Sequence, residues 1–244
     1  MMTKLSVNIN KIATIRNARG GDTPNVKEAA VKAQQFGAHG ITVHPRPDER
    51  HIRYSDVYEI KPIIITEFNI EGNPIDKFIE LVLDVKPEQV TLVPDADDAI
   101  TSNAGWDTIN NLSFLTEVIS EFKSNGIRTS IFLDPNPKMV ESAARTGTDR
   151  IELYTEDFAT AYSKGNLDGI KPYKETAAEA VNAGLKINAG HDLSLDNLQY
   201  FLEQIPDTEE VSIGHALISE AIYMGLENTI QSYLKRIERA FGQF

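Results

Sequence analysis

Four of the five histidines follow segments that the residue pattern predicts as strands. They are His44, His51, His191 and His215. Imidazole exchanges protons close to neutral pH, so histidines gathered at one site are suited to general acid–base catalysis. A single histidine is more often structural, and it is the grouping that favours chemistry here. The fifth, His39, precedes a predicted strand, and we expect it to be structural.

Two glutamates accompany these histidines. Glu71 directly follows the apolar segment 67–70, and Glu152 lies within the segment RIELY. A carboxyl group that points into an enclosed site loses hydration, which raises its pKa towards the range in which it exchanges protons at neutral pH. The alternative is that each pairs with Arg46, Lys11 or another cation and only holds the loops. We favour catalysis for Glu71, and both interpretations stay open for Glu152.

Positive side chains collect after the first two predicted strands although the chain is acidic. The composition is 24 Lys and Arg against 36 Asp and Glu, a formal charge of −12. Cations kept against that balance indicate an anionic ligand, most simply a phosphate ester. The alternative is that Arg16 or Arg19 pairs with Asp22 or Glu28. The cations of this group are Lys11, Arg16, Arg19, Arg46 and Arg50, and residues 13–22, which contain Arg16 and Arg19, are expected to form a loop after the first strand.

A second candidate anion site lies in the segment SIGHALI. Ile213 ends a predicted strand, Gly214 permits close approach of the backbone, and a short helix is predicted to begin after it. The free N–H groups at the start of a helix bind anions. The turn NAGHD, residues 188–192, is predicted to lie beside it.

Composition limits the class of protein. A surplus of negative charge argues against nucleic acid or an anionic membrane as a partner. The absence of cysteine removes disulfides, thiolate nucleophiles and Cys-based metal sites. No run approaches 18 apolar residues, and the first residues lack the pattern of a signal peptide. We therefore expect a cytoplasmic globular protein.

Short β-branched strands alternate with amphipathic helices along the chain. Eight such units in 244 residues leave about 30 residues for each, the length of a βα repeat. This alternation predicts an α/β fold and a single (β/α)8 TIM barrel, whose chemistry sits at the C-terminal ends of the strands. An open doubly wound sheet is the alternative, without a GxGxxG segment to support it. The expected strands are 5–9, 40–43, 67–70, 89–93, 128–133, 150–153, 185–188 and 210–213.

We expect one catalytic domain over residues 1–244, because no linker-like segment divides the chain. Segments 101–109 and 155–170 exceed the usual loop length and are candidates for extra helical segments, for gating or for subunit contacts. Trp106 is expected to anchor the first by packing. Residues 226–241 are expected to form a closing helix whose exposed aromatic side chains are available to an oligomer interface.

Six segments resemble, in order and spacing, the signature segments of the pyridoxine 5′-phosphate synthase family, the ring-closing enzymes of vitamin B6 biosynthesis. The resemblance spans nearly the whole chain, and its first two segments are the most specific. The segments are NINKIATIRNARGG at 8–21, GITVHPRPDERHI at 40–52, NIEGN at 69–73, LVPD at 92–95, KINAGHDL at 186–193 and SIGHALI at 212–218.

The resemblance implies a (β/α)8 barrel that condenses 1-deoxy-D-xylulose 5-phosphate with 3-amino-2-oxopropyl phosphate, without metal or organic cofactor and as an octamer. It implies that His44 and Glu71 are general bases, that His191 is the general acid and that Glu152 is a supporting carboxylate. The implied contacts to the aminoketone phosphate are Asn8, Arg19, Asp192, Gly214 and His215. The implied contacts to deoxyxylulose phosphate are Asn10, Lys11, Arg46, His51 and Thr101.

This chain departs from the usual family pattern at four positions. Asn10 and Lys11 stand where aspartate and histidine are usual, which removes a carboxylate and an imidazole. Asp192 replaces a glycine, and its charge would repel a phosphate unless its side chain points away. Tyr154 stands where histidine is expected. We expect Lys11 to act as an electrostatic ligand and not as a proton shuttle.

Three other functions fit part of the pattern. The first is a metal-dependent barrel enzyme that uses His44, Glu71, Glu152, His191 and His215 as ligands. The second is a Schiff-base aldolase that uses Lys11. The third is a phospho-sugar binding module without turnover. None of them explains the six matching segments.

Overall fold

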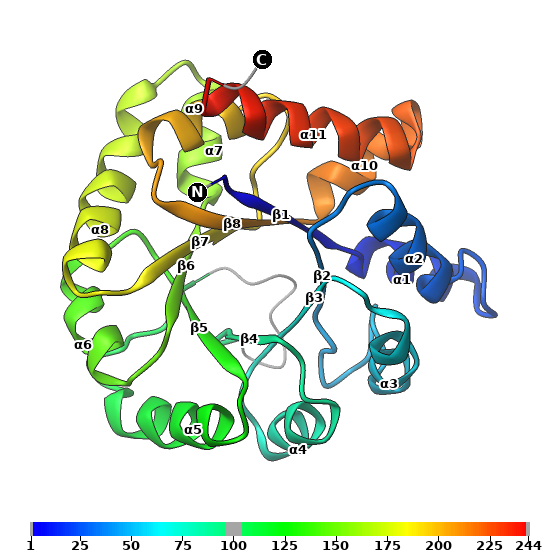
Figure 1. Ribbon diagram of the computed structural model, residues 1–244, viewed down its shortest axis with the longest axis horizontal. Coiled ribbons are helices and arrows are strands. Elements are labelled where there is room, and N and C mark those ends of the chain that lie inside the picture. Colours follow the sequence, from blue (N-terminus) through cyan, green and yellow to red (C-terminus); the bar gives the residue numbers. More distant parts are fainter. Residues whose placement is uncertain (1, 96–103, 243–244) are drawn as a thin grey trace.

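Eight parallel strands close into a barrel at the centre of the molecule (Figure 1). The computed structural model describes residues 2–95 and 104–242. Each strand pairs with the next along the chain, and β8 returns to pair with β1, so that Lys4 lies opposite Glu210. The prediction of a (β/α)8 barrel is therefore confirmed.

The elements have the following bounds. The strands are β1 Lys4–Asn8, β2 Gly40–Val43, β3 Glu67–Gly72, β4 Gln89–Leu92, β5 Arg128–Leu133, β6 Arg150–Tyr154, β7 Lys186–Gly190 and β8 Thr208–Ile213. The helices are α1 Asn10–Arg19, α2 Val26–Gln35, α3 Tyr54–Ile60, α4 Asp76–Val85, α5 Leu112–Ser124, α6 Val140–Arg145, α7 Glu156–Ser163, α8 Lys171–Asn182, α9 Leu198–Gln204, α10 His215–Met224 and α11 Leu226–Ala240. Short 3-10 turns are η1 Lys61–Ile63, η2 Pro137–Met139 and η3 Leu167–Ile170.

All eight expected strands are present, but three of them continue further at their C-terminal ends than expected. Strand β3 continues to Gly72, so Glu71 lies within the strand and not after it. Strands β6 and β7 continue to Tyr154 and Gly190. The backbone hydrogen bonds between neighbouring strands do not require apolar side chains. The strands therefore continue beyond the apolar runs, where the inward-facing side chains near the mouth are polar.

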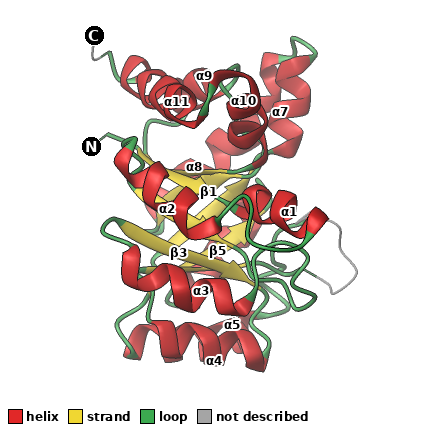
Figure 2. Cartoon of the chain, turned by 90° about the vertical axis from the view of Figure 1, so that its right-hand side faces the viewer, coloured by secondary structure: helices red, strands yellow, loops and turns green. Residues whose placement is uncertain are grey.

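The expectation of a loop over residues 13–22 is wrong for the first seven of them, because residues 10–19 are helical. They form helix α1, which begins where the Asn8 side chain accepts a hydrogen bond from the Asn10 N–H at 3.0 Å. The helix ends before Gly20, whose φ of 78° suits glycine. In Figure 2, α1 lies at the end of the barrel to which the strands point.

The barrel interior is polar, and the main apolar core lies between the strands and the surrounding helices. Val7 and Ile41 face outward and are fully buried in that core. Inside the barrel, Ser6 and Thr42 share a hydrogen bond of 2.7 Å, and Arg150 donates one of 2.8 Å to Asn188. Strand alternation thus sends one set of side chains to the core and the other set to the site.

The structure tests the expectations for the two long segments, 101–109 and 155–170, to different extents. Residues 155–170 contain α7 and η3, which confirms the expected extra helical segment. The first part of 101–109 lies outside the described residues, whereas Trp106 is buried in the core as expected. For the closing helix the expectation of exposed aromatics is wrong, because Tyr233 is fully buried and Phe241, which directly follows α11, is half-buried against the core. Tyr223, 91% exposed at the end of α10, is instead on the surface.

Candidate active site

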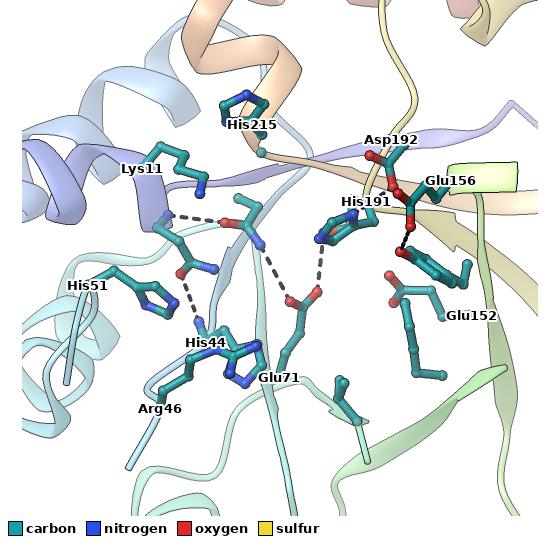
Figure 3. A pocket seen from close by; sticks show the side chains of 17 residues that line it. Lys11, His44, Arg46, His51, Glu71, Glu152, Glu156, His191, Asp192 and His215 are labelled. Carbon is teal, nitrogen blue, oxygen red and sulfur yellow. Dashed lines mark hydrogen bonds and ion pairs between the residues drawn. The ribbon is translucent and has the colours of Figure 1, made fainter. Parts of the chain in front are cut away.

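A cavity of about 340 Å³ opens at the C-terminal ends of the strands. Figure 3 shows the side chains that surround it. It is lined by Asn8, Asn10, Lys11, His44, Arg46, His51, Glu71, Val93, Phe132, Glu152, Tyr154, Glu156, His191, Asp192, Ser212, Gly214 and His215. This set contains twelve of the fourteen site residues expected from the sequence.

The other two expected residues are Arg19 and Thr101. Arg19 is the last residue of α1, is exposed, and does not line the cavity formed by the described residues. Thr101 lies outside the described residues.

Helices α1, α7 and α10 deliver residues to the cavity by their first turns. Helix α1 brings Asn10 and Lys11, and helix α10 begins at His215 directly after Gly214. A Cβ atom at Gly214 would lie 3.1 Å from the Asn8 side chain, so glycine permits this close approach. The start of the ten-residue helix α10 thus offers backbone N–H groups and a positive dipole end to an anion.

Glu71 is buried beneath the cavity and is held by neutral side chains. It accepts hydrogen bonds from Asn8 Nδ2 and Ser212 Oγ, each at 3.4 Å. Burial raises the pKa of Glu71 to about 7, although the charge of His191 and the Ser212 hydrogen bond oppose the rise. The carboxyl group therefore exists in both protonation states near neutral pH.

Glu152 occupies an equally buried position on β6. Thr91 Oγ1 donates a hydrogen bond to it at 3.4 Å. Burial raises the pKa of Glu152 well above its usual value, and the negative charges of Glu71 and Glu210 raise it further. Its hydrogen-bond partner is neutral, whereas the alternative interpretation expected Lys11 or Arg46 beside it.

His44 lies near a buried ion pair after β2. Arg46 pairs with Asp95, whose Oδ2 is also 3.8 Å from His44 Nε2. Burial holds the pKa of His44 well below its usual value, and the charges of Arg46, His51 and His191 lower it further. His44 is therefore a neutral imidazole. Asp95, in the segment LVPD, was not singled out from the sequence.

His51 is neutral for a similar reason. Burial lowers its pKa to about 4, and the charges of Arg46 and Lys11 act in the same direction. Its backbone oxygen accepts a hydrogen bond of 3.1 Å from Arg16 Nη2. His51 thus serves as a neutral hydrogen-bonding group beside two cations.

Arg16 does not face the cavity, nor does it pair with Asp22 or Glu28, so both expectations for it are wrong. Its guanidinium is buried and forms two hydrogen bonds with Asp56, at 2.6 and 2.8 Å. It therefore fixes α1 to the start of α3. Arg50 pairs with Asp48 at 2.6 Å on the protein surface.

His191 is flanked by carboxylates, as Figure 3 shows. Its Nδ1 lies 2.6 Å from Asp192 Oδ2. Burial alone lowers the pKa of His191, but the hydrogen bond and charge of Asp192, with the charges of Glu71 and Glu156, raise it above its usual value. The Asp192 side chain is thus engaged with an imidazole. His39, by contrast, accepts a hydrogen bond from the Leu5 N–H, as expected for a structural residue.

One wall of the cavity is apolar and was missed in the sequence. It consists of Val93, Phe132 and Tyr154, which form a small buried cluster. The centroids of the Phe132 and Tyr154 rings lie 5.3 Å apart. Tyr154 lies two residues after Glu152 on β6, so strand alternation is the signal that would have placed Tyr154 in the cavity, whereas Phe132 faces it as the register partner of Glu152 on β5. Such a wall suits a flat organic ring.

The ligand set of the metal-dependent alternative does not assemble. Among residues 2–95 and 104–242, no three His, Cys, Asp or Glu side chains are arranged to hold a metal ion. In the same ranges, no helix is both long enough and apolar enough to traverse a bilayer.

A closed (β/α)8 barrel with buried acid–base groups and cations at its C-terminal mouth defines an enzyme that acts on small anionic molecules. The chain belongs to the family described as pyridoxal phosphate biosynthesis protein PdxJ, whose model matches residues 5–239. The membership expected from the six segments is therefore confirmed.

Two curated relatives are both named pyridoxine 5′-phosphate synthase. A pyridoxine 5′-phosphate synthase of Christiangramia forsetii is 68% identical over 97% of this chain and 100% of its own. One of Flavobacterium johnsoniae is 64% identical over the same shares.

Solved structures with low sequence identity share the fold. A 3-keto-L-gulonate-6-phosphate decarboxylase from Vibrio cholerae superposes with a TM-score of 0.67 at 9% identity, over 98% of this chain and 99% of that one. A thiamine phosphate pyrophosphorylase from Pyrococcus furiosus gives 0.65 at 14% identity, over 98% and 97%.

Proposed function

We propose that this chain is a pyridoxine 5′-phosphate synthase. It condenses 1-deoxy-D-xylulose 5-phosphate with 3-amino-2-oxopropyl phosphate and releases pyridoxine 5′-phosphate, inorganic phosphate and water. A relative of that name is 68% identical to this chain over 97% of its length. The observation that carries the chemistry is that Glu71, with a pKa of about 7, and His191, paired with a carboxylate, point towards each other across one cavity.

The reaction needs proton transfers at several atoms of one bound intermediate. An amine must add to a ketone, a hydroxyl group must leave as water, and C–H protons must be removed before the ring becomes aromatic. Acid and base groups around a single cavity meet this need, and holding both reactants together supplies much of the rate.

We assign the base roles to His44 and Glu71. His44 is neutral and can accept a proton, and the ionised fraction of Glu71 near pH 7 can do the same. We assign the acid role to His191, whose elevated pKa supports a protonated ring that can protonate a leaving hydroxyl group. Glu152 supports them as a largely protonated carboxyl group under the intermediate.

Two ends of the cavity suit two phosphate groups. Lys11 and Arg46, with neutral His51 and Asn10, suit deoxyxylulose phosphate. The start of α10 at Gly214 and His215, with Asn8, suits the aminoketone phosphate. Arg19, Thr101 and the backbone of Asp192 stay proposed contacts from the family resemblance.

We also propose that the chain forms one catalytic domain, works in the cytoplasm and assembles as a homo-oligomer, an octamer by resemblance. Ile222 and Tyr223, 69% and 91% exposed at the end of α10, support an interface there. Light scattering on the purified protein measures the assembly, and a monomer at micromolar concentration would contradict it.

The function is tested by mixing both phosphates with the purified protein. We expect the ultraviolet absorbance of pyridoxine 5′-phosphate to appear together with one inorganic phosphate per product, and no product from either substrate alone. Binding without product would favour a phospho-sugar binding module. A lysine adduct at Lys11 after borohydride treatment would favour the Schiff-base aldolase.

A further inference from the structure

The turn that follows β7 is held rigidly on both sides of His191. Thr155 Oγ1 donates a hydrogen bond to the Gly190 oxygen at 2.6 Å and accepts one from the Asp192 N–H at 3.1 Å. Asn197 Nδ2 donates to the Asp192 oxygen at 3.3 Å. His191 itself has a φ of 87°, in the left-handed region that costs a β-carbon residue energy. Such a conformation persists only where its surroundings fix it.

Within this turn, the Asp192 side chain has one close partner. Its Oδ2 lies 2.6 Å from His191 Nδ1. A carboxylate only accepts hydrogen bonds, so the proton between them belongs to Nδ1. The other ring nitrogen, Nε2, is then the one that gains and loses a proton, and the ring points towards Glu71 in the cavity (Figure 3).

Other charged and titratable groups also face His191. Glu71 approaches from β3 and Glu156 from the first turn of α7. His44 approaches from the loop after β2. The Tyr154 and His191 rings pack edge to face with their centroids 5.5 Å apart, and the Tyr154 hydroxyl donates a hydrogen bond to Glu156. Asp192 is the carboxylate in direct hydrogen-bond contact.

We propose that Asp192 is a positioning residue for the proton-donating step. It fixes the tautomer and orientation of His191 through Nδ1 and keeps the ring charged, so that Nε2–H points at the bound intermediate. This inference deepens the proposed function and depends on it for the identity of the step. The pairing itself is a property of the protein without substrate.

The proposal predicts in which direction the pH dependence of the reaction rate changes when Asp192 is replaced. An acid catalyst is active while it holds its proton, so activity falls as pH rises through the pKa of His191. Removing the negative charge of Asp192 lowers that pKa. The alkaline fall of the reaction rate should then begin at a lower pH, while KM changes little because binding does not need the proton.

Three variants separate charge from orientation. Asp192→Asn keeps an oxygen that can accept from Nδ1 but removes the charge. Asp192→Gly removes both and fits the turn without a side chain. Asp196→Asn makes the same change of charge on an exposed residue of the same loop and serves as the matched control.

The first measurement is the NMR titration of the His191 imidazole without substrate. We expect a lower pKa in Asp192→Asn and Asp192→Gly and no change in Asp196→Asn. The second is the pH dependence of kcat. We expect Asp192→Asn to match the wild type near pH 6 and to be about 10-fold slower at pH 8, part of the ~10²-fold or larger contribution of a general acid. Asp192→Gly should be slower at both values.

The outcomes are separable. An unchanged His191 titration in both Asp192 variants overturns the pairing, whatever the activity. If the pKa of His191 is lowered but the pH dependence of kcat is not shifted, Asp192 has no role in the proton-donating step. Failure of the wild type to make pyridoxine 5′-phosphate would overturn the proposed function and leave the titration result standing.

Discussion

The surroundings of individual side chains decide which groups in the cavity hold a proton. Burial raises the pKa of Glu71 to about 7, while it holds the pKa of His44 well below its usual value. For His191, Asp192 and the neighbouring carboxylates outweigh burial and raise the pKa. When the surroundings of neighbouring groups make their pKa values differ, one site can donate and accept protons at the same pH.

His44→Ala should lower kcat by at least about 10²-fold, the typical contribution of one acid–base group. KM should change modestly, because cations supply most of the binding of the phosphates. The measurement is steady-state kinetics on folded protein. His39→Gln is the control, since His39 serves a backbone contact to Leu5 outside the cavity. A His44→Ala variant with wild-type kcat would remove His44 from the mechanism.

Lys11→Met should weaken the binding of deoxyxylulose phosphate without an equal loss of kcat, since a charged contact to substrate is made before and during the reaction. Lys11→His should bind it more weakly at high pH than at low pH, because imidazole loses its charge above about pH 6.5. Lys27→Met, on the outer surface of α2, controls for net charge. Unaltered affinity in Lys11→Met across that range would mean that the residue only packs at the mouth.

The types of most cavity residues could be predicted from the sequence, but their pairings could not. His44, Glu71 and His191 are recognisable because they follow strands whose ends meet at one face. The contact of Arg16 with Asp56 joins residues 40 positions apart, so it depends on how α1 packs. The two orientations open to Asp192, towards a phosphate or away from it, are likewise decided by the turn.

At the level of elements, helix α1 lines the cavity and is attached to α3 by the buried ion pair of Arg16 with Asp56. Arg16→Met should lower the free energy of unfolding by about 3 kcal/mol, because it leaves the largely buried Asp56 carboxylate without its cation. Chemical denaturation at neutral pH measures this. Arg19→Ala, an exposed change on the same helix, should have little effect on stability. A loss under about 1 kcal/mol in Arg16→Met would show that the pair is not a significant tie.

Most elements could be predicted because strands and helices alternate and several helices stop at glycine. Gly37 and Gly184, for example, have φ values of 100° and 78° and stand where a helix turns back to the barrel. Helix α1 could not be predicted, because its apolar residues do not form one buried stripe. Ala13 is buried, whereas Ile15 is 47% exposed and a charged residue, Arg16, faces inward.

At the level of the whole molecule, buried carboxyl groups inside the barrel link stability to pH. Glu71, Glu152 and Glu210 all have pKa values raised first by burial. The folded protein therefore keeps protons that the unfolded chain releases above about pH 4.5. The contribution of these groups to the free energy of unfolding is complete below that pH and is lost as pH rises through the folded-state values.

Glu71→Gln should therefore stabilise the protein at pH 8 and have much less effect at pH 5. A rise in pKa from 4.5 to about 7 corresponds to a difference of about 3 kcal/mol. Denaturation curves at both pH values measure it. Glu121→Gln, on the exposed surface of α5, is the control for loss of charge. An equal effect of Glu71→Gln at pH 5 and pH 8 would contradict the raised pKa.

Strand β3 offers the most direct test of the claim that the polar end of this barrel makes pyridoxine 5′-phosphate by acid–base catalysis. Glu71 lies near its C-terminal end in the cavity, and Glu67 begins it at the opposite end, paired with Lys4 and Arg128. The measurement is product formation from both phosphates by the wild type, Glu71→Gln and Glu67→Gln. We predict at least about 10²-fold slower turnover for Glu71→Gln and near wild-type turnover for Glu67→Gln. Equal turnover by the two folded variants would contradict the account.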